Sequence, residues 1–431
     1  MPGPRPARSD LRGPLAFLAG GVVGAGIFAV GHWASAPPTG EDLTGYARVR
    51  DLVEREFVQD RTREDLLGAA LEGLTAELDP YSRFYRGEDL RRVERTTAGT
   101  YLGLGLILAR PLEDGLVRFP LDGSPARAAG LVPGDRIVAM DGDLLSELPP
   151  GAFEQRLGAL TDTPVAFLVD GTDGARRTVE VTPAEVLDPS VRHETLLEDG
   201  IGYLAITSFT RRTLDEFDAA VQRLDAAGMG SLVVDLRGNP GGVLRAALAV
   251  ANRFVGEGDL LVTRTREGAT PTPALPEEAV LAGLPLVLLV DGDSASASEV
   301  LAGALQDHRA AVLVGDATYG KGTVQTLVHT AYPEGIAKIT TAFYSTPAGR
   351  SIDRHYREDG GAALAPDVQV SLDDEQRMDV RHFLAGHSPP ADLADAVAAQ
   401  RVAAGLPAST RPGTDPQLAA ALGLLQPEAG R

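Results

Sequence analysis

The chain has 431 residues, enough for roughly two to four domains, because a single hydrophobic core stops growing at about 250–300 residues. Its net charge of −20 argues against a nucleic-acid partner, which would need a basic surface. It has no cysteine, which excludes disulfides and cysteine metal sites, and its seven histidines form neither an HExxH motif nor an i, i+4 pair. We therefore expect a modular globular protein that uses no metal or other cofactor.

An apolar, uncharged stretch near the N-terminus is long enough to cross a membrane. It covers residues 14–33, follows three arginines, and at about 1.5 Å per residue would span a bilayer as a helix. Positive charge before a span keeps that end in the cytoplasm. An A-x-A sequence at residues 34–36 leaves a cleaved signal peptide open as the alternative, with a buried core helix as a third interpretation. We expect residues 1–36 to be a membrane anchor or signal segment, and the rest to lie outside the cytoplasm, in the cell envelope or, after cleavage, secreted or periplasmic.

Residues 37–96 predict a small N-terminal helical module. Their apolar residues show helical spacing, and the stretch closes at Asp79-Pro80. One stripe of leucines in this segment has the spacing i, i+4, i+7 and i+11. Its members are Leu67, Leu71, Leu74 and Leu78.

Residues 97–184 predict a β-rich domain, because short apolar alternations are separated there by turns. The sequence Gly103-Leu104-Gly105-Leu106 and the segment 123–142 together resemble a PDZ domain. In such domains a glycine-apolar loop offers backbone N–H groups to a peptide carboxylate, while the peptide adds a strand to the sheet edge. The resemblance implies a peptide-binding loop at these four residues.

Residues 185–375 alternate strand and helix patterns, which predicts an α/β core. The remaining residues, 376–431, form an Ala- and Pro-rich tail, and no fold is assigned to the part from 388 onward. The expected fold class is therefore a multidomain α/β protein.

The stretch DGDSASASE (291–299) follows the apolar run LPLVLLV, where a buried strand turns into a helix. The first N–H groups of that helix would suit a nucleophile and a developing oxyanion. Ser296 and Glu299 also fit an S-x-x-E capping box, so these nine residues by themselves favour a structural role.

A lysine in TYGKGTVQ (318–325), after the next predicted strand, supports a catalytic role instead. A serine hydroxyl needs a base, and a lysine can serve when burial lowers its pKa, whereas an arginine stays protonated. Lys321 is one of only two lysines among the 40 basic residues of the chain. A phosphate-binding loop is the alternative, but the spacing of GxxxxGK[ST] is missing.

A third segment, DLRGNPGG (235–242), also follows a predicted strand. Its glycines permit a tight turn that can present N–H groups to an oxyanion, and a plain type I or II turn is the structural alternative.

In this order, behind a PDZ-like segment, DLRGNPGG, SASASEVLAGALQD, TYGKGTVQ and ITTAFYSTPAGRSI resemble the C-terminal processing peptidases, or tail-specific proteases. The resemblance covers about residues 41–372 and implies a Ser-Lys protease core. It implies Ser296 as nucleophile, Lys321 as base and Gln325 as the residue that orients the base. It also implies the backbone N–H groups of Gly238 and Ala297 as the oxyanion hole, and Ala297 is the residue expected from its place after the serine.

Two residues differ from the pattern of many relatives. Asp291 stands where they have asparagine, and Asp170 where they have a basic residue late in the PDZ domain. Asp307 lies about three helical turns, or about 16 Å, from Ser296 and is interpreted as structural.

The sequence therefore predicts a serine endopeptidase that cleaves protein substrates near their C-termini and recognises their tails with a PDZ domain. Its expected partners are proteins or peptides with accessible C-terminal tails and the membrane, and self-association is left open. The alternative is a non-catalytic envelope adaptor that binds protein tails. Intact Ser296, Lys321 and Gln325 argue against the adaptor.

Overall fold

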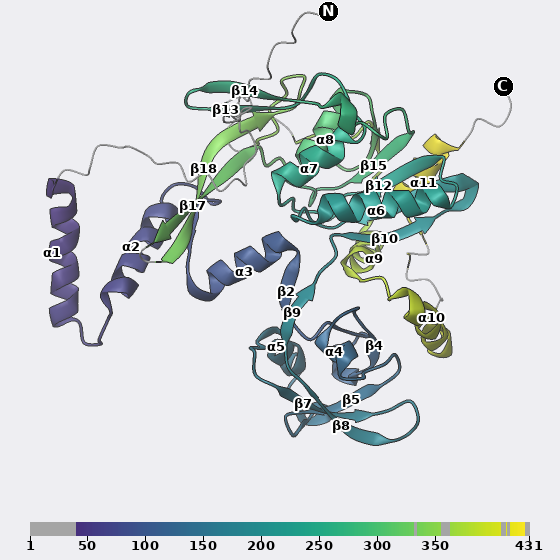
Figure 1. Ribbon diagram of the computed structural model, residues 1–431, viewed down its shortest axis with the longest axis horizontal. Coiled ribbons are helices and arrows are strands. Elements are labelled where there is room, and N and C mark those ends of the chain that lie inside the picture. Colours follow the sequence, from purple (N-terminus) through teal and green to yellow (C-terminus); the bar gives the residue numbers. More distant parts are fainter. Residues whose placement is uncertain (1–39, 332–333, 355–362, 407–410, 412–413, 427–431) are drawn as a thin grey trace, which may run out of the picture.

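The computed structural model describes residues 40–331, 334–354, 363–406, 411 and 414–426 (Figure 1). Its largest sheet has six strands in the order β10-β11-β12-β15-β16-β19, and every neighbouring pair except β10-β11 is parallel. This arrangement follows from alternating strands and helices, because a parallel pair needs a helical crossover. The strands are β10 (Val191–Leu196), β11 (Ile201–Ile206), β12 (Ser231–Asp235), β15 (Leu286–Val290), β16 (Val312–Gly315) and β19 (Val368–Gln369).

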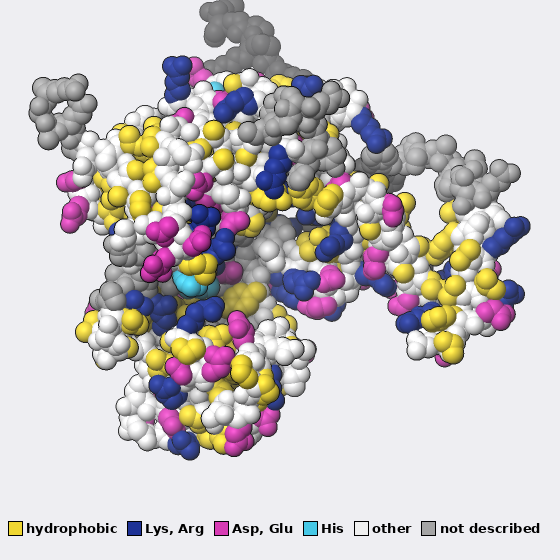
Figure 2. Space-filling view, turned by 180° about the vertical axis from the view of Figure 1, so that it is seen from behind, with side chains coloured by type: hydrophobic (Ala, Val, Ile, Leu, Met, Phe, Trp, Pro, Cys, Tyr) yellow, Lys and Arg dark blue, Asp and Glu magenta, His cyan; other side chains and the backbone are white. Residues whose placement is uncertain are grey.

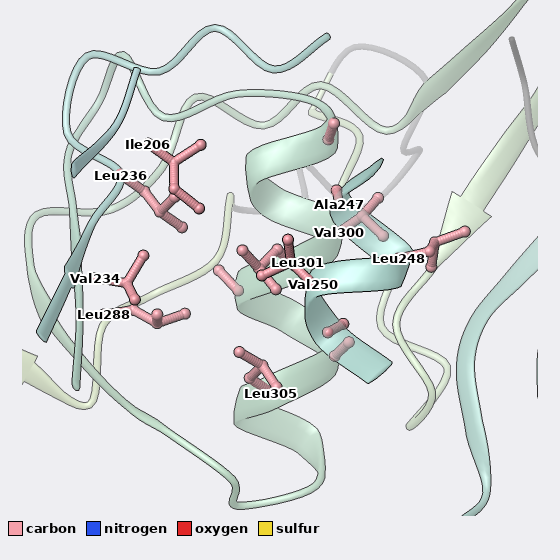
Figure 3. Packing of buried hydrophobic residues seen from close by; sticks show 14 of the residues in the cluster. Ile206, Val234, Leu236, Ala247, Leu248, Val250, Leu288, Val300, Leu301 and Leu305 are labelled. Atoms are coloured by element: carbon pink, nitrogen blue, oxygen red, sulfur yellow. The ribbon is translucent and has the colours of Figure 1, made fainter. Parts of the chain in front are cut away.

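Both faces of this sheet are covered by helices. One set of alternate strand residues packs with α6, α7 and α8, as Figure 3 shows around Val234, Leu288 and Leu301. The opposite set, which includes Tyr203 and Val233, packs against α9 and α11. The strands are therefore buried on both sides and read as continuous apolar runs. The covering helices are α6 (Thr213–Ala226), α7 (Leu244–Asn252), α8 (Ala297–Asp307), α9 (Asp374–Ala385) and α11 (Pro416–Leu425).

A second, antiparallel sheet lies beside the first and contains the segment that follows Lys321. Its order is β1-β18-β13-β14, with β17 pairing with β18. Strand β1 comes from the N-terminal part of the chain and places Arg83 opposite Lys338 of β18. The strands are β1 (Arg83–Tyr85), β13 (Asp259–Thr265), β14 (Gly268–Pro273), β17 (Thr323–Ala331) and β18 (Glu334–Ser345).

Residues 100–187, called the β-rich domain below, have a hydrophobic core of their own, around Phe153 and Phe167. In Figure 1 this domain lies below the two larger sheets, connected through β2 and β9. Its elements are β2 (Thr100–Gly103), β3 (Leu106–Leu108), β4 (Val117–Pro120), α4 (Pro125–Ala128), β5 (Arg136–Met140), β6 (Asp143–Leu144), α5 (Ala152–Gly158), β7 (Val165–Asp170), β8 (Arg176–Val181) and β9 (Ala184–Leu187).

The N-terminal residues that the structure describes form α1 (Gly40–Glu56), α2 (Arg63–Ala76) and α3 (Gly87–Ala98). Helices α1 and α2 project from the body, and apolar side chains are visible on them in Figure 2. The expected leucine stripe is only partly buried: Leu74 and Leu78 are 65% and 53% exposed, because no element of the described chain covers that side.

Three α-helices lie in the C-terminal residues that the structure describes, a segment predicted as a tail with no fold assigned from residue 388 onward. Helices α9 and α11 cover the large sheet, and α10 (Ala394–Ala403) packs Val397 against Phe119, Leu121 and Val186 of the β-rich domain. These helices were not predicted from the sequence, because their burial depends on surfaces made by distant segments.

The predicted membrane span, residues 14–33, lies outside the described residues. Among the helices that the structure describes, none is both long enough and apolar enough to cross a membrane.

Candidate active site

Ser296 lies where the loop after β15 enters α8, and its backbone is unusual. Its φ is 58° and its ψ is −115°, a conformation that costs a non-glycine residue free energy and is often found at functional sites. Gly241 packs directly against it: a Cβ there would lie 2.8 Å from Ser296 Cβ and 2.9 Å from the Ala297 nitrogen. Only glycine permits this approach, so the turn 238–242 and the serine loop depend on each other.

The other two serines of DGDSASASE hold the loop together. The Ser294 hydroxyl donates to the Leu236 carbonyl at 2.8 Å, and the Ser298 hydroxyl donates to the Asn239 carbonyl at 3.0 Å. Both side chains are buried. Of the three serines, Ser296 is the one that lines the cavity described below.

Glu299 connects the serine to the lysine loop. This buried carboxylate accepts the Ser296 N–H at 2.8 Å and the Lys321 N–H at 2.9 Å. It also accepts the Gly320 N–H at 2.7 Å and the Thr318 hydroxyl at 2.6 Å. Burial raises the pKa of Glu299, and these hydrogen bonds act in the opposite direction. The residue predicted as a helix cap therefore fixes both halves of the site.

The Lys321 side chain enters a partly water-excluded environment. Burial and, after it, the charge of Lys338 lower its pKa to about 8, while Glu299, Asp79 and Asp353 act in the opposite direction. Its ammonium lies 4.5 Å from the centre of the Tyr81 ring. The described residues give this ammonium no ion pair, and at pH 8 about half of it is the neutral amine that can accept a proton.

Ser296, Lys321 and Gln325 line one cavity of about 370 Å³. Its polar wall also includes Lys338 and Tyr344, whose hydroxyl donates to the Lys321 carbonyl and contacts the Ser296 side chain. The apolar wall is formed by Phe209, Leu244, Val324 and Leu327. Such a cavity suits an apolar side chain next to a polar reacting group.

Gln325 is placed differently from the implied role. Its amide nitrogen donates to the Thr323 hydroxyl at 2.9 Å and to the Thr340 hydroxyl at 3.3 Å. In the part of the chain that the structure describes, no hydrogen bond joins Gln325 to the Lys321 ammonium.

The two implied oxyanion donors differ in whether their N–H groups are occupied. Ala297 follows Ser296 as the first residue of α8, and its N–H makes no hydrogen bond within the described chain. The Gly238 N–H donates to the Asp291 carboxylate at 2.9 Å, and Gly238 lines a separate cavity of about 720 Å³. Gly241 and Gly242 are the glycines of this turn that line the Ser296 cavity. In this structure the N–H of Gly238 is therefore occupied by the Asp291 carboxylate.

Asp307 has the structural role that its distance implied. At the far end of α8 it accepts the Ala348 N–H at 2.7 Å and pairs with Arg350.

Sequence reasoning missed Tyr81, Lys338 and Tyr344. Only Lys338 carried a signal, as the second of two lysines. Tyr81 comes from outside the core and reaches the site through the pairing of β1 with β18.

Several known proteins are similar to this chain in sequence. The model of peptidase family S41 matches residues 200–370. A carboxy-terminal-processing protease of Bartonella bacilliformis is 30% identical over 84% of this chain and 83% of its own length. A carboxyl-terminal-processing protease of Synechocystis is 35% identical over 68% of this chain and 70% of its own length. A solved photosystem II D1 C-terminal processing protease is 30% identical, covers 76% of this chain and 86% of its own, and has a TM-score of 0.44.

The first relative spans most of both chains, and its match extends well beyond the catalytic segment. The chain therefore belongs to peptidase family S41, and it is a serine-type endopeptidase of the carboxyl-terminal processing proteases.

Proposed function

We propose that this protease works by a Ser-Lys mechanism in which Ser296 is the nucleophile and Lys321 the general base. The neutral Lys321 amine takes the Ser296 hydroxyl proton as the serine oxygen bonds to the scissile carbonyl carbon. When the tetrahedral intermediate collapses, the C–N bond breaks and the Lys321 ammonium returns the proton to the leaving amine. Water then hydrolyses the acyl-enzyme, with Lys321 again accepting the proton.

The oxyanion is proposed to bind the N–H groups of Ala297 and Gly242. Gly242 follows the glycine that contacts Ser296, and its N–H has no hydrogen-bond acceptor among the described residues. Both groups border the cavity or the serine directly. Removing one oxyanion donor typically costs about 10²–10³ in kcat, so the choice between Gly238 and Gly242 has a measurable consequence.

A single observation carries the proposal: Ser296 and Lys321 line one cavity and are tied to the same buried carboxylate. Gln325 lines that cavity too. We propose that its side chain shifts slightly when substrate enters, and then orients Lys321.

The test uses Ser296→Ala, Lys321→Arg and the double variant, with initial rates on a peptide that ends in apolar residues. Each single variant should abolish turnover, because a guanidinium does not release its proton in the working pH range. The double variant should be no worse, since residues that act as a unit are not additive. Ser298→Ala is the matched control: it removes a hydroxyl two residues away that does not line the cavity.

The pH dependence gives an independent check. The base must be neutral, so kcat/KM of the wild type should rise with pH and level off above about 8. A folded Lys321→Arg protein with wild-type turnover would refute the mechanism.

Substrate tails are proposed to bind the β-rich domain as they bind a PDZ domain, at Gly103, Leu104, Gly105 and Leu106. Gly105 has a φ of 64°, and a cavity of about 500 Å³ runs along β3 from Leu106. The Gly105 N–H faces the Tyr101 hydroxyl, which a carboxylate would have to displace. Amidating a substrate's C-terminus should therefore weaken its binding, whereas equal affinity for free and amidated tails would remove this assignment.

We also propose that the catalytic domain lies outside the cytoplasm, attached to the membrane by residues 14–33 or released by cleavage after 36. The charge pattern of residues 1–33 supports this location. Protease added outside intact spheroplasts should digest the chain, and protection would contradict it.

A further inference from the structure

The two lysines of this chain share one cavity. All 38 other basic residues are arginine, yet both Lys321 and Lys338 line the cavity that contains Ser296. They come from different segments: Lys321 precedes β17, and Lys338 lies within β18. The chain otherwise uses arginine for its side-chain cations, yet its only two lysines both line the cavity that contains the proposed nucleophile.

Lys338 is half-buried and has little to neutralise it. Its ammonium has no ion pair and no side-chain hydrogen bond in the portion of the chain that the structure describes. Burial lowers its pKa, Arg83 on the paired strand lowers it further, and Asp79 acts in the opposite direction. Asp79 itself is occupied by hydrogen bonds from the Tyr81 and Ser82 N–H groups and from the Ser82 hydroxyl.

The charged groups around Lys321 come from four elements. Lys338 in β18 opposes protonation of Lys321, while Glu299 in α8, Asp79 before β1 and Asp353 after β18 favour it. Among these charges Lys338 has the largest effect. Two ammonium groups in one partly desolvated cavity repel each other, because the effective dielectric there is well below that of water.

We propose that Lys338 is a positioning residue that acts through Lys321, as a fixed cation that keeps the Lys321 amine unprotonated and ready to accept the Ser296 proton. A second cation next to a catalytic lysine is a known means of activating it. Lys338 touches neither the nucleophile nor the scissile bond in this role, and the inference depends on the proposed function of Lys321.

The experiment compares the full-length wild type with Lys338→Met and Lys338→Arg. Methionine keeps the length and removes the charge, and arginine keeps the charge. The measurement is kcat/KM between pH 6 and 10 on an N-acetylated apolar peptide without groups that titrate in this range. Circular dichroism verifies the fold, and Lys338→Gln replaces Lys338→Met if the latter does not fold.

For Lys338→Met, the rising limb of the plot of kcat/KM against pH should move to a pH about one unit higher. The reason is that the repulsion favouring the neutral Lys321 amine is lost. At pH 7, below the Lys321 pKa of about 8, this corresponds to roughly tenfold lower kcat/KM. The value of kcat/KM on the alkaline plateau of Lys338→Met should stay within about twofold of wild type. The rising limb of Lys338→Arg should lie at the same pH as in the wild type.

Other outcomes overturn the inference in recognisable ways. A lower plateau with an unmoved limb would make Lys338 merely structural. If Lys338→Met raises the KM for free-acid peptides but not for amidated ones, and the rising limb of its pH profile is unmoved, Lys338 would be a site for the substrate carboxylate. If Lys321→Arg is inactive while the Lys338→Met limb does not move, only this inference fails. If Lys321→Arg is active, the proposed function fails as well.

Discussion

The catalytic cavity and the β-rich domain are held in place by different means. Around the cavity, buried polar groups fix the geometry: Glu299 and Asn239 are fully buried, and each makes hydrogen bonds to segments distant in sequence. The β-rich domain instead has a small apolar core of its own. Buried, satisfied polar networks specify one arrangement, whereas a separate core lets a domain move as a unit.

The junction between these regions is made by the C-terminal segment as well as by β2 and β9. Val397 of α10 packs into a small apolar cluster with Phe119, and Gln400 donates to the Val117 carbonyl at 2.9 Å. Arg127 pairs with Asp392. Figure 2 shows basic and acidic side chains intermixed where the two regions meet. From this difference we infer that peptide-bond cleavage requires the rigid geometry around the catalytic cavity, whereas tail binding tolerates small movements of the β-rich domain at this junction.

The strongest test of separate cores is a matched pair of substitutions, Phe167→Ala in the β-rich domain and Phe217→Ala in the catalytic core. Both side chains are fully buried, so each change should cost about 3–5 kcal/mol in its own domain. Calorimetry should show one lowered transition in each variant. Only Phe167→Ala should retain cleavage of a short amidated peptide. If Phe167→Ala lowers both transitions together, the two regions form one cooperative unit.

A smaller effect is expected for Asp291→Ala, which sharpens the account of the rigid region. Asp291 accepts the N–H groups of Gly238, Asp293 and Ser294, so its loss should cost about 1–3 kcal/mol in denaturant unfolding. Turnover should remain within about threefold, since Gly238 lines the larger cavity and not the one that contains Ser296.

The control for this change is Asp293→Ala, which removes an exposed partner of Arg381 and should cost less than about 1 kcal/mol. A marked rise in kcat for Asp291→Ala would return Gly238 to the oxyanion hole.

The smallest effect is expected at the junction. Val397→Ala removes two buried methyl groups from the contact of α10 with the β-rich domain and should weaken that contact by about 1–2 kcal/mol. Amides of residues 394–403 should then exchange faster with solvent. Val402→Ala is the matched control in the same helix, because that side chain is 60% exposed. Equal exchange in both variants would show that α10 does not depend on this cluster.

The sequence by itself was sufficient to predict strands and helices wherever the local pattern of apolar residues matches the burial in the structure. Continuous apolar runs predicted β12, β15 and β16, and helical spacing predicted α6, α7 and α8. The segments DLRGNPGG, DGDSASASE and TYGKGTVQ follow strands of one sheet, and because parallel strands end at the same edge, they meet at one cavity. The position of each motif directly after a parallel strand therefore determined which segments come together.

Tertiary structure decided which individual groups face that cavity. The N–H of Gly238 is occupied by Asp291, a residue 53 positions later, and no local rule for the turn contains that information. Tyr81 reaches Lys321 only because β1 pairs with β18 across more than 250 residues of sequence. Helices α9, α10 and α11 pack on surfaces of the sheet and the β-rich domain that are made by distant segments, so their own sequences carry little signal of this packing. In each case the deciding free energy comes from a partner distant in the chain.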